Sequence, residues 1–220
     1  MRIHLKTTAN TSVVPFNYQQ KLVGVLHRWL GAYNKEHGAI SFYSFSWLLH
    51  GKWQKDGLDF PEGATWQISF IETENIKQII RLIRQDASMF CGMSVVNIII
   101  EEEPDLSERN LFHCASPILI KRKEGECERH YTYNDAVSAD LLKETLQTKM
   151  RKAGLPEDET LEIYFDTSCP KKKTKLIHYR NIGNKTNLCP VIIKGKPETK
   201  AFAWHVGIGS STGIGFGAIY

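Results

Sequence analysis

The chain has 220 residues, of which 42% are hydrophobic and 24% are charged, as is ordinary for a globular protein. Its length suits one large domain or two domains of roughly 100 residues each. No apolar run is long enough to cross a membrane, and the N-terminus lacks a signal-peptide pattern, so we expect a cytoplasmic protein without membrane contact. The net charge of +4 permits a polyanionic partner without requiring one. The five cysteines are widely spaced and form no Cys-x-x-Cys pair, which predicts reduced thiols and argues against a zinc site.

The first half of the chain alternates strand and helix patterns. Strands are expected at residues 2–8, 42–47, 64–71 and 93–100, and the last of these is apolar enough to lie centrally in a sheet. One helix should begin near Tyr18 and bury Leu22, Leu26 and Trp29, and a second should span residues 74–84. The resulting order, β-α-β-β-α-β, is the ferredoxin-like arrangement.

An acidic, proline-broken linker is expected at residues 101–105, and the second half partly repeats the first. Strands are expected at 116–123, 161–165, 175–181, 189–194 and 201–206, with an amphipathic helix at 135–153. We therefore predict an α+β fold of two tandem ferredoxin-like halves, with domains at residues 1–103 and 110–220.

The chain ends in a glycine-rich loop, residues 207–217, with glycine at positions Gly207, Gly209, Gly213, Gly215 and Gly217. Glycine permits positive φ and close backbone approach, and a row of backbone N–H groups suits a phosphate. A Walker loop is excluded because the loop has no lysine, and a dinucleotide fingerprint is excluded because no further βα units follow. The other interpretations of this stretch are a flexible tail or a glycine-punctuated β-turn.

Four segments together resemble a known family. They are the strand-like residues 201–206 running into the glycine loop, Pro15-Phe16-Asn17-Tyr18 leading to His27, His37-Gly38 leading to Phe42-Tyr43-Ser44-Phe45, and Ser116-Pro117-Ile118-Leu119-Ile120. In this order they are similar to the CRISPR-associated endoribonucleases that cut repeat RNA, members of the RAMP superfamily. Several members carry a lysine where this chain has Ser41, so a third catalytic cation is not assigned.

The resemblance implies metal-independent cleavage without a cofactor. The ribose 2′-OH attacks the adjacent phosphorus, and the products carry a 2′,3′-cyclic phosphate and a 5′-OH. Histidine suits the acid and base roles because its unperturbed pKa lies near 6.5. The expected catalytic residues are His37, His27 and Tyr43; which histidine is the acid is left open. The alternative roles are an exposed loop histidine for His37, a structural boundary residue for His27 and a core aromatic for Tyr43.

RNA contacts are expected from two cationic clusters and from the glycine loop. The clusters are Lys171, Lys172, Lys173 and Lys175 in a hairpin, and Lys121 with Arg122. A solvated turn is the other reading of such a lysine run. The expected partner is CRISPR repeat RNA in the precursor transcript, with other CRISPR effector subunits as further candidate partners. The protein is expected to be a monomer or a homodimer.

Two other functions remain open at this stage. A RAMP-type subunit that holds guide RNA without cutting it would carry the same glycine loop. A small-molecule enzyme or sensor built on tandem ferredoxin-like halves would instead hold a nucleotide there, in a concave apolar pocket.

Overall fold

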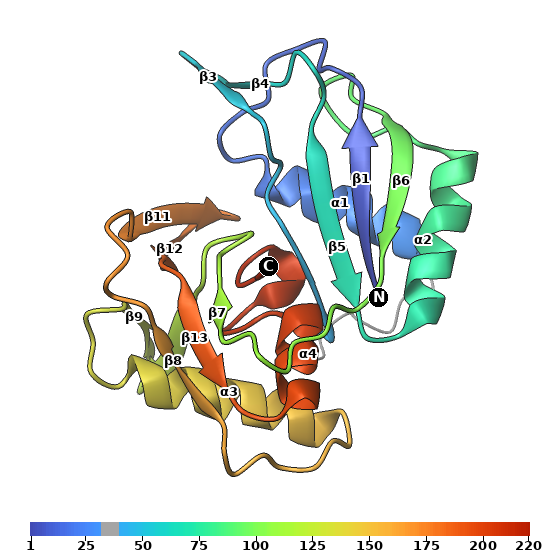
Figure 1. Ribbon diagram of the computed structural model, residues 1–220. Coiled ribbons are helices and arrows are strands. Elements are labelled where there is room, and N and C mark those ends of the chain that lie inside the picture. The colour runs from blue at the N-terminus through green and yellow to red at the C-terminus, as the bar shows by residue number, and fades with distance from the viewer. Residues whose placement is uncertain (32–39) are drawn as a thin grey trace.

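The structure, a computed structural model, describes residues 1–31 and 40–220 (Figure 1). Its first half has a four-stranded antiparallel sheet in the order β2-β5-β1-β6. The elements are β1 Arg2–Thr7, α1 Gln19–Leu30, β2 Tyr43–Phe45, β5 Thr65–Phe70, α2 Thr73–Gln85 and β6 Val95–Glu101. A short hairpin, β3 Lys52–Gln54 and β4 Gly57–Asp59, is inserted between β2 and β5.

Alternation along β1 decides which side of the sheet is covered. Ile3 and Leu5 are fully buried in one core with the apolar stripes of α1 and α2, and both helices lie on one face of the sheet (Figure 1). Arg2 and His4 point to the opposite face, where Arg2 donates hydrogen bonds to Trp204 and Ile219 of the second half. The sheet thus packs helices on one side and presents polar side chains to the other half.

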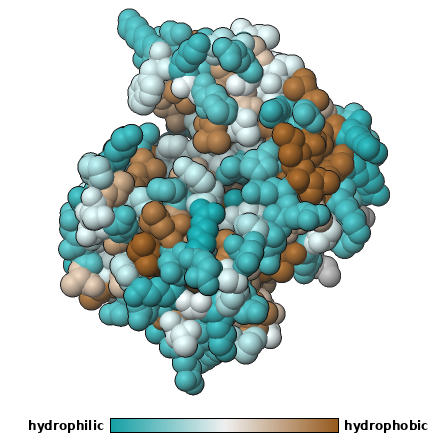
Figure 2. Space-filling model, viewed as in Figure 1, coloured by the Kyte–Doolittle hydropathy of each residue, from teal (hydrophilic) through white to brown (hydrophobic). Residues whose placement is uncertain are grey.

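The prediction that residues 93–100 form a central strand is wrong. β6 is the outermost strand of the sheet, and its apolar side chains remain accessible, with Val96 63% and Ile100 53% exposed. Figure 2 shows a hydrophobic patch at this position, over β6. Hydropathy alone misplaced the strand because an exposed apolar edge and a buried central strand have the same composition.

The second half repeats the arrangement with shorter strands. Its sheet has the order β10-β13-β7, and residues 218–220 extend it through a bridge between Cys114 and Ile219. The elements are β7 Leu111–Phe112, α3 Ser138–Lys152, β10 Glu162–Phe165, β13 Val191–Lys194 and α4 Pro197–Val206. Two hairpins project from this half: β8 Ile120–Glu124 with β9 Cys127–Tyr131, and β11 Lys173–Tyr179 with β12 Ile182–Leu188. The α+β fold of tandem ferredoxin-like halves is confirmed.

One of the expected strands in this half is wrong, and another begins later in the chain than expected. Residues 201–206 belong to helix α4, which begins with Pro197 in its first turn and is buried on nearly every side. A helix without a polar face has no 3.6-residue periodicity, so its aromatic residues look like a strand in the sequence. Residues 116–119 are not in a strand; β8 starts at Ile120, and β7 opens the half instead. None of the helices in the described ranges could span a bilayer.

Candidate functional site

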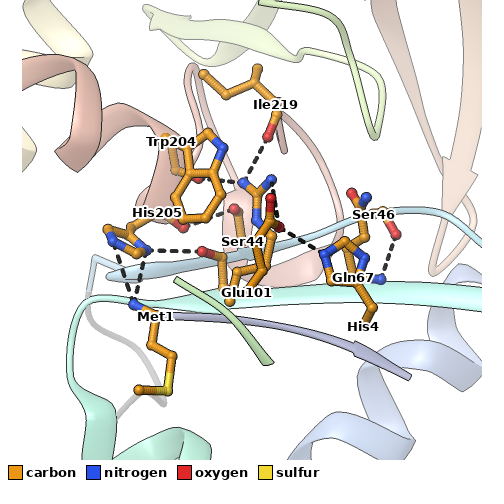
Figure 3. Close-up of polar contacts among 11 residues, drawn as sticks. Met1, His4, Ser44, Ser46, Gln67, Glu101, Trp204, His205 and Ile219 are labelled. Carbon is orange, nitrogen blue, oxygen red and sulfur yellow. Dashed lines mark hydrogen bonds and ion pairs between the residues drawn. The ribbon is translucent and has the colours of Figure 1, made fainter. Parts of the chain in front are cut away.

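The C-terminal end of α4 is the junction of the two halves (Figure 3). The last four carbonyl groups of a helix have no partner within it. Here, the Gly207 N–H donates to Ala203 O, and Arg2 Nη2 donates to Trp204 O at 2.8 Å. Ser44 Oγ donates to His205 O at 2.9 Å, and Lys149 Nζ donates to Val206 O at 3.2 Å. The four groups come from α4's own end, β1, β2 and α3, so one helix end joins the sheet of the first half to the helices of the second half.

Arg2 contributes more than one hydrogen bond to this junction. Its guanidinium also donates to Ile219 O at 2.8 Å and lies 3.5 Å from the centroid of the Trp204 ring. The side chain is only 3% exposed, and burial lowers its pKa to about 10, so it stays charged at neutral pH. A buried cation at a helix C-terminus is favoured by the helix dipole.

His205 adds a second polar contact between the halves (Figure 3). Its Nε2 lies 2.7 Å from a Glu103 carboxylate oxygen, and its Nδ1 lies 3.0 Å from Ser69 Oγ. Burial, and then the positive charge of the Met1 amino group, lower the pKa of His205 to about 4 despite Glu103. A neutral ring with its hydrogen on Nε2 donates to Glu103 and accepts from Ser69. His205 therefore serves as a structural contact at neutral pH.

The glycine loop, residues 207–217, follows α4 directly and is held by the first half of the chain. Three consecutive backbone carbonyls of the loop accept hydrogen bonds from side chains of the first half. The Tyr43 hydroxyl donates to Gly213 O at 3.0 Å, Gln19 Nε2 to Ile214 O, and Trp47 Nε1 to Gly215 O at 3.2 Å. Two of the loop's N–H groups, those of Ser210 and Gly217, donate to the carbonyls of Leu119 and Pro117. The glycine loop therefore connects the two halves of the protein.

Two of the loop's glycines show why these positions leave no room for a side chain. A Cβ on Gly213 would lie 2.1 Å from Ser41 Oγ. Gly217 has a φ of +68°, and a Cβ there would lie 1.9 Å from Ile208 O. All five predicted glycines are buried. The structure accounts for them by close packing, and their contact with RNA stays a prediction.

A pocket of about 420 Å³ opens beside the glycine loop. The partly exposed tip of the glycine loop, Ser210 and Ser211, forms one wall, and α3 forms another. Ile40 and Ser41, the first described residues after the segment that contains His37, complete it. The lining residues are Ile40, Ser41, Arg122, Glu144, Thr145, Thr148, Lys149 and residues 209–212. The lining combines apolar surface with several hydroxyl groups, the buried Lys149 amine, and the Arg122 guanidinium paired with the Glu144 carboxylate.

Lys149 is the residue of this pocket that sequence reasoning missed. Its amine donates to Thr212 Oγ1 at 2.9 Å as well as to Val206 O, and burial lowers its pKa to about 7. The signal was present in the sequence. Lys149 falls on the same helical stripe as Leu142 and Leu146, at i+7 and i+3, where an apolar residue is expected.

The structure describes two of the three predicted catalytic residues. His37 lies outside the described residues. His27 is half-buried at the C-terminal end of α1 and is not among the described residues that line the pocket. Tyr43 is 1% exposed, stacks on Phe70 at 4.7 Å and donates to the glycine loop. Its placement explains a structural role for this tyrosine, while the catalytic roles of all three stay predictions.

The two predicted cationic clusters differ in their electrostatics. Lys121 pairs with Glu128 at 2.8 Å and Arg122 with Glu144 at 2.9 Å. None of the four hairpin lysines forms an ion pair with a carboxylate in the part of the chain that the structure describes. Those lysines are Lys171, Lys172, Lys173 and Lys175, at the start of the β11–β12 hairpin. The hairpin therefore has the cationic charge that remains available to a polyanion.

Comparison with known proteins agrees with this architecture. The family model for the C-terminal part of CRISPR-associated protein Cas6 matches residues 101–220. A solved structure of a CRISPR-associated protein Cas6 is 21% identical, with a TM-score of 0.84 over 100% of this chain and 98% of its own. A Cas6-related protein from Pyrococcus furiosus is 22% identical, with a TM-score of 0.83 over 100% and 97% of the two chains.

A third solved structure is described as a RAMP protein binding different RNA substrates. It is 21% identical, with a TM-score of 0.86 over 100% of this chain and 98% of its own. Identities this low show a shared fold. No curated protein matches the chain in sequence.

Proposed function

The chain belongs to the CRISPR-associated Cas6 family, and from this premise we propose that it is an endoribonuclease that cuts the repeat RNA of CRISPR transcripts. The 2′-OH of one ribose attacks the adjacent phosphorus and displaces the 5′-oxygen of the next nucleotide. The products carry a 2′,3′-cyclic phosphate and a 5′-OH. The reaction needs a base, an acid and positive charge near the non-bridging oxygens, and it uses no metal or cofactor.

The observation that carries the proposal is the polar pocket between Ser41, the glycine loop and α3. His37 lies outside the described residues, and we propose that its imidazole acts on a phosphate seated at this pocket. Arg122, which is paired with Glu144, and the buried amine of Lys149 lie in its wall.

His27 precedes the segment that contains His37 in the sequence and lies three residues before the end of α1 at Leu30. We propose that His27 and His37 share the two proton transfers. Each such transfer contributes about 10²–10⁴ in rate, so the loss of either ring should slow cutting strongly. We assign Tyr43 to positioning, because its hydroxyl holds Gly213.

The test is cleavage of repeat RNA in EDTA, with and without a 2′-deoxy sugar at the cut site. Cutting in chelator that disappears with the deoxy sugar supports the mechanism, and a requirement for magnesium contradicts it. His37→Ala and His27→Ala should each lower the cleavage rate at least 100-fold, with RNA affinity nearly unchanged.

His50→Asn is the matched control. His50 is exposed with a φ of +74°, a conformation that asparagine tolerates, so this variant should cut at the wild-type rate. If the protein binds repeat RNA tightly but never cuts it, a guide-RNA-holding subunit is the correct description.

A further inference from the structure

A pocket distinct from the one above lies between the β3–β4 hairpin and β11. Its volume is about 230 Å³, and its lining includes Phe16, Trp47, Trp53, Lys175 and His178. The first three come from the first half of the chain and the other two from the second half. Three aromatic rings, one ammonium and one imidazole therefore converge on a small space between the halves.

The aromatic side chains at its rim are unusually accessible. Trp53 is 74% exposed and Phe16 is 48% exposed, and their ring centroids lie 4.8 Å apart at an interplanar angle of 40°. All three residues of β3 are exposed, so the hairpin presents Trp53 to solvent without burying it in either core. Large aromatic side chains exposed together mark a binding surface more often than a structural one.

The charge in the pocket is positive. Lys175 Nζ lies 5.0 Å from the centroid of the Trp47 ring, and within the described ranges Lys175 forms no ion pair. Burial first, and then the neighbouring Lys173, lower the pKa of Lys175. An anionic ligand would compensate both penalties, because it supplies the charge that the protein itself does not place here.

Aromatic faces next to an unpaired cation are the combination that single-stranded nucleic acids use. The bases stack on rings, and the phosphates follow the positive charge. A double helix keeps its bases stacked inside and cannot offer a free face to Trp53. The small volume of the pocket also suits one base better than a duplex.

We propose that this pocket binds one unpaired nucleotide of the RNA substrate, with its base stacked on the Trp53–Phe16 pair and its phosphate beside Lys175. This inference rests on the proposed function only in taking RNA as the ligand. It concerns binding alone and requires no cleavage.

The experiment measures equilibrium binding of fluorescein-labelled octauridylate and octaadenylate by anisotropy, so that catalysis is not the readout. Trp53→Ala should weaken binding of both octamers by about 5- to 100-fold, the effect expected for loss of one stacked base. Trp53→Phe should retain most of the affinity because its ring still stacks. Val96→Ala, which removes atoms from another highly exposed apolar residue, on β6, should bind like the wild type.

A blunt-ended RNA duplex, which has no unpaired nucleotides, separates the possible outcomes. Its affinity should not change in Trp53→Ala. Equal losses for duplex and octamers, or no loss for the octamers, would overturn the proposal. So would a change in molar mass of Trp53→Ala by light scattering, which would assign the surface to a protein contact. If the protein never cuts RNA but Trp53→Ala still loses octamer affinity, this inference stands and the nuclease proposal fails.

Discussion

At the scale of single residues, Lys149 connects stability to pH. Its amine is buried among oxygen atoms of α4 and the glycine loop, and its pKa is lowered from 10.5 to about 7. Between these two values the unfolded chain holds a proton that the folded chain has released. The free energy of unfolding should therefore rise as pH increases from 7 to about 10.

Lys149→Met tests this sign. Urea denaturation of the wild type and the variant at several pH values gives the difference between their unfolding free energies. That difference should change in favour of the wild type as pH rises from 7 to 10. A difference independent of pH over this range would show that Lys149 titrates normally in the folded protein.

At the scale of secondary structure elements, the sheet of the first half is asymmetric. Ile3 on β1 and Ile100 on β6 are paired in register, but Ile3 is fully buried while Ile100 is 53% exposed. Ile3→Val should lower the unfolding free energy by about 0.5–1.5 kcal/mol, because it removes a buried methyl group. Ile100→Val should change it by less than about 0.5 kcal/mol. Urea titrations of the two variants compare them directly, and equal losses would mean that β6 is covered in solution.

The same elements show what a sequence can predict. β1 and α2 each have one apolar and one polar face, so their periodicity placed them correctly. Helix α4 lacks a polar face and β6 lacks a covering layer, and periodicity failed for both. The contacts to the carbonyls at the end of α4 could not be predicted from the sequence either, because they join segments up to 202 residues apart. The glycine loop was recognised, but its packing role depends on residues from the other half.

At the scale of the whole molecule, charge distribution should govern affinity for RNA. Lys172 belongs to the unneutralised cluster before the β11–β12 hairpin, whereas Lys194 pairs with Glu162 at 2.9 Å. Lys172→Ala should weaken repeat-RNA binding and reduce the slope of log K against log salt concentration by about 0.7–0.9. Lys194→Ala should leave the slope nearly unchanged. Binding titrations from 50 to about 200 mM salt compare the slopes of the two variants. Identical slopes would show that the hairpin does not contact the RNA.

The arrangement at the end of α4 has a consequence for how the protein holds together. Arg2 and Ser44 donate hydrogen bonds to the end of α4 in the second half. Tyr43, Gln19 and Trp47 donate hydrogen bonds to the glycine loop that follows α4. The connecting peptide at residues 102–110 is thus not what keeps the halves associated. A protease nick in that peptide would leave a non-covalent pair of fragments, which should co-elute and melt as one cooperative unit.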